Sequence, residues 1–169
     1  MDSVRIITTD EKHLASYHHC LDVVARERRY IALVEAPPIE ALSAFVNAVL
    51  NGAGVHLVAV DDSETVLGWC DIFRNPREGF RHGGQLGMGL LPSVRGMKLG
   101  GRLAGAAIAQ AWDQGMERIE LEVFASNAPA MALYRKLGFT VEGVRQRSRE
   151  LDGRYDDNVF MALLRKPVV

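Results

Sequence analysis

Residues 90 to 103, with the sequence LLPSVRGMKLGGRL, predict the end of a strand, a glycine-rich loop and the start of a helix. Three glycines lie within six residues, so a ligand can approach the backbone closely there. The first turn of a helix carries free N–H groups and a partial positive charge, which together favour a bound phosphate. Arg95 and Lys98 add positive charge beside these groups. The loop is therefore a candidate phosphate- or pyrophosphate-binding site.

Two common nucleotide-binding motifs do not fit this loop. A P-loop requires a lysine and then a serine or threonine directly after its last glycine, whereas Arg102 and Leu103 follow Gly101. A dinucleotide-binding fold requires Gly-x-Gly-x-x-Gly, and the glycines here have a different spacing. On this stretch alone, a glycine-rich turn that binds no ligand remains an alternative.

Length and composition limit the class of protein. A chain of 169 residues can form one domain with its own core, so we expect a single domain over residues 1–169. Charged residues make up 24% and nearly cancel to a net charge of −1, which favours neither a nucleic-acid partner nor an anionic membrane surface. We expect neither a signal peptide nor a membrane-spanning segment, because the printed sequence has no basic start followed by a long apolar run. With two cysteines and no disulfide framework, we expect a cytoplasmic protein.

The N-terminal part of the chain predicts two helices among short extended segments. Residues 4–8 are rich in β-branched side chains, typical of a first strand, and a cap at residue 9 or 10 can start a helix that runs to about residue 28. Residues 30–35 are expected to be extended, and residues 39–50 fit a second helix. The apolar face of that helix is expected to comprise Leu42, Phe45, Val46 and Val49.

The middle of the chain predicts a sheet with mixed strand directions. Residues 56–60, 65–73 and 85–91 are expected to form three successive antiparallel strands, because their connections are short. The glycine loop then leads into a helix over residues 99–114 and a strictly alternating strand over residues 118–123. A strand, a crossover helix and another strand imply parallel pairing at this point.

The C-terminal part adds a helix and a hairpin. Asn127 can cap a helix over residues 128–137, and Gly138 ends it. Residues 139–144 and 155–164 are expected to be the last two strands, joined across an Asp-Gly turn. The fold class expected is therefore α+β, with a mixed α/β sheet of about seven strands and helices on both faces.

Two motifs within these elements resemble those of the GNAT superfamily of acetyl-CoA-dependent N-acetyltransferases. In that superfamily the loop reads Gln/Arg-x-x-Gly-x-Gly/Ala; Arg95 and Gly100 match its two ends. Residues 121–139, LEVFASNAPAMALYRKLGF, resemble the superfamily's strand followed by Asn-x-x-Ala-x-x-Leu-Tyr-x-x-x-Gly-Phe. The resemblance covers essentially the whole chain and is to bacterial ribosomal-protein and polyamine types. It implies a GNAT-like fold that uses acetyl-CoA as cosubstrate.

Lys98 departs from the loop motif, because it stands where the superfamily has its middle glycine. Glycine adopts positive φ freely, whereas lysine does so at a cost of about 1 kcal/mol. Either the loop bends differently here or Lys98 carries that strain, and in both cases its amide can point at a phosphate. We hypothesise that its ammonium also contacts a phosphate of CoA.

The resemblance implies that the fourth strand separates from the fifth and that the pantetheine arm of acetyl-CoA lies in the gap. Backbone groups of residues 88–90 would hold this arm, with one N–H near the thioester oxygen, and the glycine loop would hold the pyrophosphate. An ordinary β ladder is the alternative. The residues expected to bind the cofactor are Met88, Gly89, Leu90, Arg95, Gly96, Met97, Lys98, Leu99, Gly100, Gly101, Asn127 and Tyr134.

The implied reaction is the attack of an amine on a thioester carbonyl. A free aliphatic amine has a pKa of about 10.4, so it must lose a proton before it reacts. Tyr134 matches the tyrosine that often protonates the leaving thiolate in the superfamily; an aromatic residue packed in the core is the alternative. Asn127 matches a residue that contacts the CoA arm, and a role as helix N-cap is equally expected.

Three carboxylates are candidates for the base and for binding the acceptor. In relatives that acetylate the N-terminus of a ribosomal protein, a glutamate at the place of Glu122 is proposed as the base; an ion-paired or solvated glutamate is the alternative. Asp71 on the third strand is a second candidate. Glu35 lies where the superfamily's first two helices wall the acceptor site and would steer a cationic amine; an exposed loop glutamate is the alternative.

Residues 18–20, His-His-Cys, look like metal ligands, but neighbours on a helix point to different faces, so no metal is expected. The expected function is direct transfer of the acetyl group of acetyl-CoA to a primary amine of a small molecule or peptide. A non-catalytic acyl-CoA-binding or sensor module of the same fold is the alternative. The resemblance also allows a homodimer, because superfamily members often pair through their terminal strands. The sequence does not identify the acceptor amine.

Overall fold

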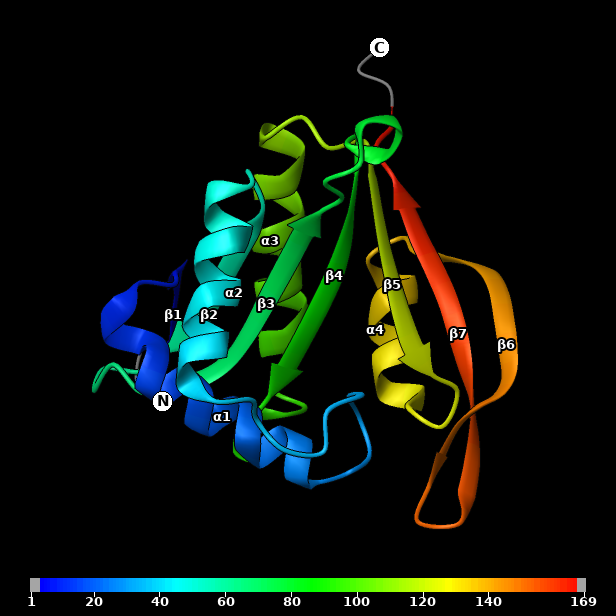
Figure 1. Ribbon diagram of the computed structural model, residues 1–169, viewed down its shortest axis with the longest axis horizontal. Coiled ribbons are helices and arrows are strands. Elements are labelled where there is room, and N and C mark those ends of the chain that lie inside the picture. Colours follow the sequence, from blue (N-terminus) through cyan, green and yellow to red (C-terminus); the bar gives the residue numbers. More distant parts are fainter. Residues whose placement is uncertain (1–3, 167–169) are drawn as a thin grey trace.

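The computed structural model describes residues 4–166, and within them seven strands form one sheet with the order β1-β2-β3-β4-β5-β7-β6 (Figure 1). The strands are β1 (Arg5–Thr8), β2 (Val55–Val60), β3 (Val66–Arg74), β4 (Gly83–Leu90), β5 (Arg118–Phe124), β6 (Thr140–Leu151) and β7 (Arg154–Leu164). The helices are α1 (Leu14–Arg26), α2 (Ile39–Asn51), α3 (Leu99–Asp113) and α4 (Ala128–Lys136), with short 3-10 turns at Glu11–His13, Glu78–Phe80 and Pro92–Val94. The α+β fold with a mixed sheet of seven strands is confirmed.

Each face of the sheet carries its own apolar core. On one face, α1 and α2 pack over β2 and β3, with Tyr17 and Trp69 among the buried side chains. On the other face, α3 and α4 cover the sheet through residues such as Leu103, Leu121 and Tyr134. Several buried residues of α3 are alanines, so its backbone can lie close to the strands. The expected placement of helices on both faces is confirmed (Figure 1).

The sheet opens between its fourth and fifth strands. β2, β3 and β4 run antiparallel, while β4 and β5 run parallel, as expected. The β4–β5 pairing covers only residues 83–85 against residues 118–120. Beyond that, β5 continues to pair with β7 alone and β4 with β3 alone, so the two strands diverge (Figure 1). The second half of β4 therefore has no strand partner on the side of β5, close to where the glycine loop begins.

The segment over residues 30–35 differs from the expected extended conformation, because it forms a series of bends rather than a strand. Contacts with α1 hold the connection that follows this segment. The side chain of Asp22 accepts a hydrogen bond from the backbone N–H of Ala36 (2.9 Å), and the ring of His18 bonds the carbonyl of Pro37 (2.8 Å). With these side-chain partners from a helix, the connection does not need a neighbouring strand.

Phe45 lies on the sheet-facing side of α2, as expected, because its ring meets Phe73 and His56 on the strands below. It stays 38% exposed because it lines an open cavity. The last hairpin, in contrast, is longer than expected, since β6 continues to Leu151 with a register shift between residues 145 and 149. Both faces of this strand are largely exposed, so no alternation of apolar residues marks its second half.

None of the helices within residues 4–166 combines the length and apolar composition needed to cross a bilayer.

Candidate functional site

A cavity of about 1120 Å³ occupies the cleft between β4 and β5 and continues to the glycine loop. Its walls come from the second half of β4, the loop before α3, the end of β5 and the first turns of α4. All but two of the residues expected to bind the cofactor line it, and those two are Met97 and Leu99. Met97 is 43% exposed, and Leu99 is buried in the core under α3. The structure thus brings the two motifs together around one space.

The loop before α3 presents unused backbone donors to this cavity. Gly96 has a φ of +76° and Lys98 a φ of +62°, so both lie in the left-handed region. Lys98 is the N-cap of α3 and carries the strain that its place in the motif implied. Within the described part of the chain, the backbone N–H groups of residues 96–101 donate to no other group. Such donors at a helix N-terminus are suited to an anion.

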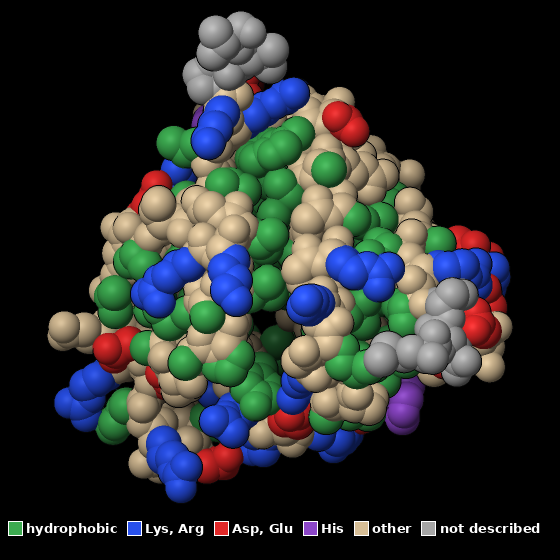
Figure 2. Space-filling view, turned by 180° about the vertical axis from the view of Figure 1, so that it is seen from behind, with side chains coloured by type: hydrophobic (Ala, Val, Ile, Leu, Met, Phe, Trp, Pro, Cys, Tyr) green, Lys and Arg blue, Asp and Glu red, His purple; other side chains and the backbone are tan. Residues whose placement is uncertain are grey.

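Positive side chains surround the cavity. The cations among its lining residues are Arg95, Lys98, Lys136, Arg145 and Arg149. Among the described residues that line the cavity, Glu122 carries the single carboxylate. Figure 2, which views the side covered by α3, shows a hollow near the centre with Lys and Arg side chains around it. This excess of positive over negative side chains favours a ligand with several negative charges.

Arg95 has protein partners for much of its guanidinium. Its Nη1 donates to Glu27 Oε2 (2.8 Å), and its Nε and Nη2 donate to the carbonyl of Leu90 (3.0 and 2.8 Å). The guanidinium also lies over the ring of Tyr30, 4.7 Å from the centroid. The hydrogen bond with Glu27 raises the pKa of Arg95, so its guanidinium stays protonated. Its role in phosphate binding stays a prediction.

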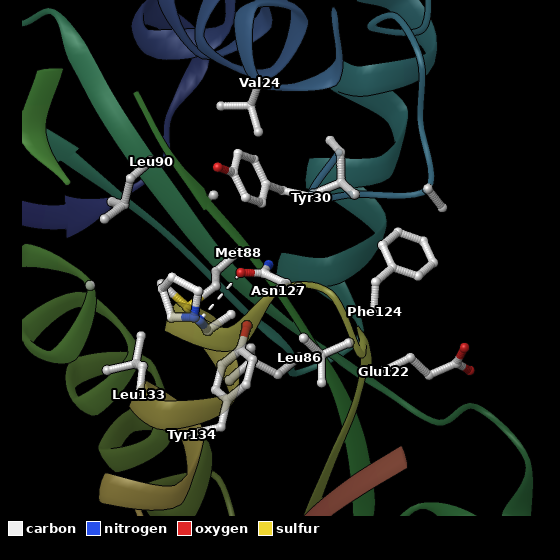
Figure 3. Close-up of a pocket in the computed structure, with 18 of the residues that line it drawn as sticks. Val24, Tyr30, Leu86, Met88, Leu90, Glu122, Phe124, Asn127, Leu133 and Tyr134 are labelled. Carbon is white, nitrogen blue, oxygen red and sulfur yellow. Dashed lines mark hydrogen bonds between the residues drawn. The ribbon is translucent and has the colours of Figure 1, made fainter. Parts of the chain in front are cut away.

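Tyr134 projects from α4 into the buried end of the cavity. Only 7% of the residue is exposed, and its ring meets that of Phe139 edge to face. Burial raises the pKa of the Tyr134 hydroxyl, so it stays protonated at neutral pH. Figure 3 shows the hydroxyl pointing in the direction of Met88 and Asn127. A neutral phenol held there can donate a proton to a group in the cavity.

Asn127 serves as the N-cap of α4. Its side-chain oxygen accepts a hydrogen bond from the backbone N–H of Ala130 (3.3 Å), drawn as a dashed line in Figure 3. The capping role expected from the sequence is confirmed. The residue also lines the cavity, so its amide nitrogen remains available to a ligand.

Glu122 lies on the solvent side of β5, opposite to the face that carries Leu121 and Val123, as the alternation predicts. Its carboxylate accepts a hydrogen bond from the side-chain amide of Asn158 on β7. In Figure 3 this carboxylate points away from the hydroxyl of Tyr134. Glu122 therefore borders the cavity without facing Tyr134.

A second cavity of about 400 Å³ lies on the other side of β4, under α1 and α2. Aromatic and aliphatic side chains form most of its wall, including Tyr17, Phe45 and Trp69. Ile31, Gly87 and Met88 line both cavities, so the two spaces adjoin at β4. A ligand in one would lie next to a ligand in the other.

Asp71 lies in the wall of the second cavity, and only 9% of the residue is exposed. Burial raises the pKa of its carboxyl to about 7, and a hydrogen bond from the side chain of Trp69 opposes this only in part. Two neighbours remain neutral at this pH, because burial raises the pKa of Tyr17 and lowers that of His56 to about 4. Asp71 is thus a buried carboxyl that titrates near neutrality, a feature common in functional sites.

Glu35 is not among the residues that line either cavity. It lies in the exposed connection between α1 and α2, and its carboxylate lies 3.6 Å from the guanidinium of Arg26. Tyr30, Arg145 and Arg149 line the first cavity, although no motif indicated them. Their positions depend on a loop and a long hairpin that have no periodic signal. Within residues 4–166, no three His, Cys, Asp or Glu side chains gather as a metal site.

The chain is similar in sequence to known acetyltransferases. The model of the Acetyltransferase (GNAT) family matches residues 18–139. The chain is 37% identical over 92 residues to mycothiol acetyltransferase of Arthrobacter sp. (strain FB24), covering 50% of this chain and 27% of that protein. It is 33% identical over 108 residues to the L-methionine sulfoximine/L-methionine sulfone acetyltransferase of Pseudomonas paraeruginosa, covering 63% of each. The chain thus spans less than two thirds of the length of either relative.

Among solved structures, the chain resembles a phosphinothricin acetyltransferase from Sinorhizobium meliloti in complex with AcCoA. The TM-score is 0.90 at 18% identity, over 95% of this chain and 88% of that one. At this identity the likeness shows a common fold.

Proposed function

The chain belongs to the GNAT family of acetyltransferases, and from this premise we propose that it transfers an acetyl group from acetyl-CoA to a primary amine. The observation that carries the proposal is the cavity between β4 and β5, which joins unused amides at the start of α3 to the buried hydroxyl of Tyr134. A long ligand with a diphosphate at one end and a thioester at the other matches this arrangement.

Binding of acetyl-CoA would use backbone groups along most of its length. The pyrophosphate would accept hydrogen bonds from the amides of residues 96–101, where the helix dipole and Lys98 add positive charge. The pantetheine arm would then run beside residues 88–90, whose outer backbone edge does not pair with β5. One N–H of this edge would meet the thioester oxygen and stabilise the oxyanion that forms during attack.

The reaction would proceed by direct attack. A base removes one proton from the ammonium, and the amine lone pair forms a C–N bond with the thioester carbonyl carbon. The tetrahedral intermediate then breaks its C–S bond, the nitrogen releases a second proton to water, and the thiolate takes a proton from Tyr134. The buried phenol suits this step because it is neutral before transfer. One of the two protons released by the nitrogen returns to the tyrosinate, so the products are an amide, CoA and one net proton.

Two carboxylates compete for the role of base. Glu122 borders the first cavity, where Asn158 orients its carboxylate. Asp71 lines the second cavity, next to the point where the two spaces adjoin. Replacing each with its amide (E122Q and D71N) and comparing kcat/KM would show which one turnover requires. A loss of about 100-fold or more marks the base.

A paired assay tests the proposal as a whole. Acetyl-CoA should raise the Tm of the protein, and thiol should appear when acetyl-CoA and an amine are both present. A rise in Tm with no thiol release from a broad amine panel would instead identify a non-catalytic acyl-CoA-binding module. No change in Tm at millimolar acetyl-CoA would remove the cofactor assignment itself.

We expect the protein to act in the cytoplasm and as a homodimer. Its two cysteines, Cys20 and Cys70, are both buried and free, which suits a reducing compartment. β6 is an edge strand of the sheet, and Val141 and Val144 on it are 45% and 52% exposed. An exposed apolar edge strand favours pairing with a second copy. Sedimentation velocity would distinguish monomer from dimer.

A further inference from the structure

We propose that the second cavity binds the acceptor, and that this acceptor is a compact primary amine on an apolar or aromatic body, without a carboxylate beside the amino group. Its ammonium would pair with Asp71. This inference rests on the proposed acetyl transfer and adds the substrate class to it.

The position of the cavity suits an acceptor. It shares Gly87 and Met88 with the acetyl-CoA cavity, so an amine in it would approach the thioester from the opposite side of β4. A volume of about 400 Å³ lies at the small end of the range of small-molecule sites. A compact acceptor therefore fits better than a folded protein surface.

The residues that line the second cavity favour a ligand with a single positive charge. Among the described residues that line this cavity, Asp71 carries the single charged side chain. Tyr17, Phe45 and Trp69 supply its aromatic surface. A single ammonium is matched by this carboxylate, while the apolar body of the amine is matched by the aromatic wall. A carboxylate next to the amine would lie near Asp71 in a desolvated space, with no cation among the lining residues that the structure describes, which is unfavourable. A second ammonium, as in a polyamine, would be buried without a partner.

Glycines on β4 keep this space open. Asp71 lies directly opposite Gly87 in the β3–β4 register, and a Cβ on Gly87 would come within 3.3 Å of its Oδ1. Trp69 lies opposite Gly89, where a Cβ would overlap the indole. A side chain at position 87 would therefore pack directly against this carboxylate and take up the space beside it. The alternation of glycines leaves Asp71 accessible at the point where the two cavities adjoin.

Asp71 can also receive the proton that the ammonium loses. Burial raises its pKa to about 7, closer to that of an aliphatic ammonium, at about 10.4, than an ordinary carboxylate would be. Proton transfer from the ammonium to Asp71 gives a neutral amine and a neutral carboxylic acid. The buried pair thereby loses both charges before the C–N bond forms.

The test uses the full chain with acetyl-CoA and a panel of amines, with thiol release as the readout. We expect kcat/KM for 2-phenylethylamine and isoamylamine to exceed that for L-phenylalanine and spermidine by about 10-fold or more. D71N should lower kcat/KM for 2-phenylethylamine by about 100-fold. It should leave the rise in Tm caused by acetyl-CoA unchanged, which shows that the variant is folded.

A pair of variants on α2 tests the location of the acceptor. Ala41 lines the cavity, whereas Ala44, one turn along the same helix, is exposed and does not. Ala41→Phe should raise KM for 2-phenylethylamine about 10-fold, because it narrows the space, while Ala44→Phe should leave KM unchanged. Equal effects of the two substitutions would overturn the assignment.

The outcomes separate the inference from the proposed function. Faster transfer to L-phenylalanine, spermidine or a peptide N-terminus than to 2-phenylethylamine would overturn the substrate class and leave acetyl transfer intact. Full activity of D71N would overturn the role of Asp71 in the same way. Absence of thiol release with every amine would overturn the proposed function, and the inference with it.

Discussion

The carboxylate of Glu27, at the end of α1, accepts hydrogen bonds from both terminal nitrogens of Arg95, at 2.5 and 2.8 Å, although the two residues lie 68 positions apart. Arg95 also bonds the carbonyl of Leu90 at the end of β4. This pair joins the loop before α3 to the opposite side of the sheet. It therefore holds the wall of the first cavity in place.

Removal of this pair should destabilise the fold as well as weaken cofactor binding. The pair is about one-quarter to one-third exposed, so we expect Glu27→Gln and Arg95→Ala each to lower the free energy of unfolding by about 1–2 kcal/mol. Urea denaturation measures this. The double variant should lose less than the sum of the single losses. Strictly additive losses would mean that the two side chains do not act together.

Lys98→Gly should separate the strain at this position from its charge. Glycine adopts the φ of +62° without penalty, so the variant should be more stable by about 1 kcal/mol. Loss of the ammonium should weaken CoA binding and reduce its dependence on salt. Calorimetric titration at two salt concentrations measures both quantities. Unchanged affinity and salt dependence would exclude a contact between this ammonium and phosphate.

Tyr134→Phe should lower kcat while acetyl-CoA affinity stays unchanged. The ring still fills the space beside Phe139, so the loss comes from the missing proton donor and should reach about 100-fold. Thiol release gives kcat, and a binding titration gives the affinity. Turnover equal to that of the unmodified protein would rule out the role of this hydroxyl as acid.

Asp71 should make the stability of the fold depend on pH. Burial raises its pKa from 3.8 to about 7, so between these values the folded state holds a proton that the unfolded state releases. Its contribution to the free energy of unfolding therefore falls as pH rises through this range. D71N lacks this carboxyl. The free energy of unfolding of D71N minus that of the unmodified protein should therefore rise by on the order of 1–4 kcal/mol from about pH 5 to about pH 8.

The difference in free energy of unfolding between D71N and the unmodified protein reports the titration of Asp71 alone. Burial keeps Tyr17 and Cys70 protonated through this range, and the pKa of His56 is lowered to about 4 in both proteins. Urea unfolding at each pH supplies the four free energies. A stability difference that is the same at both pH values would contradict the raised pKa of Asp71.

Two glycine substitutions should act in opposite directions. A Cβ on Gly89 would lie 2.3 Å from the indole of Trp69, so Gly89→Ala should destabilise the fold by about 1–3 kcal/mol. Gly105 lies within α3 with open space around its Cα, so Gly105→Ala should stabilise it by about 0.4–1 kcal/mol. Chemical denaturation of both variants gives the comparison. Equal and small effects would mean that β3 and β4 separate easily to admit a side chain.

Local sequence patterns were enough to predict the order of the elements and the position of the glycine loop before α3. The alternation over residues 118–123 and the glycines before α3 are local patterns. The conformational preferences of the residues themselves are enough to predict a strand and a loop there. Asn127 and Gly138 likewise mark the ends of α4 through capping and positive φ. These signals depend on neighbours within a few positions of the chain. The segment after α1 lacked such a signal, and its expected extended form was wrong.

The division of the candidate site into two cavities could not be predicted in the same way, because it depends on contacts between distant segments. The tertiary structure paired Arg95 with Glu27, exposed Glu35 and turned Glu122 toward Asn158. It also buried Asp71 opposite Gly87, at the junction of the two cavities. Each of these results depends on strand register and on which helix covers which face. Such contacts join residues far apart in the chain, so no local pattern of residue types encodes them.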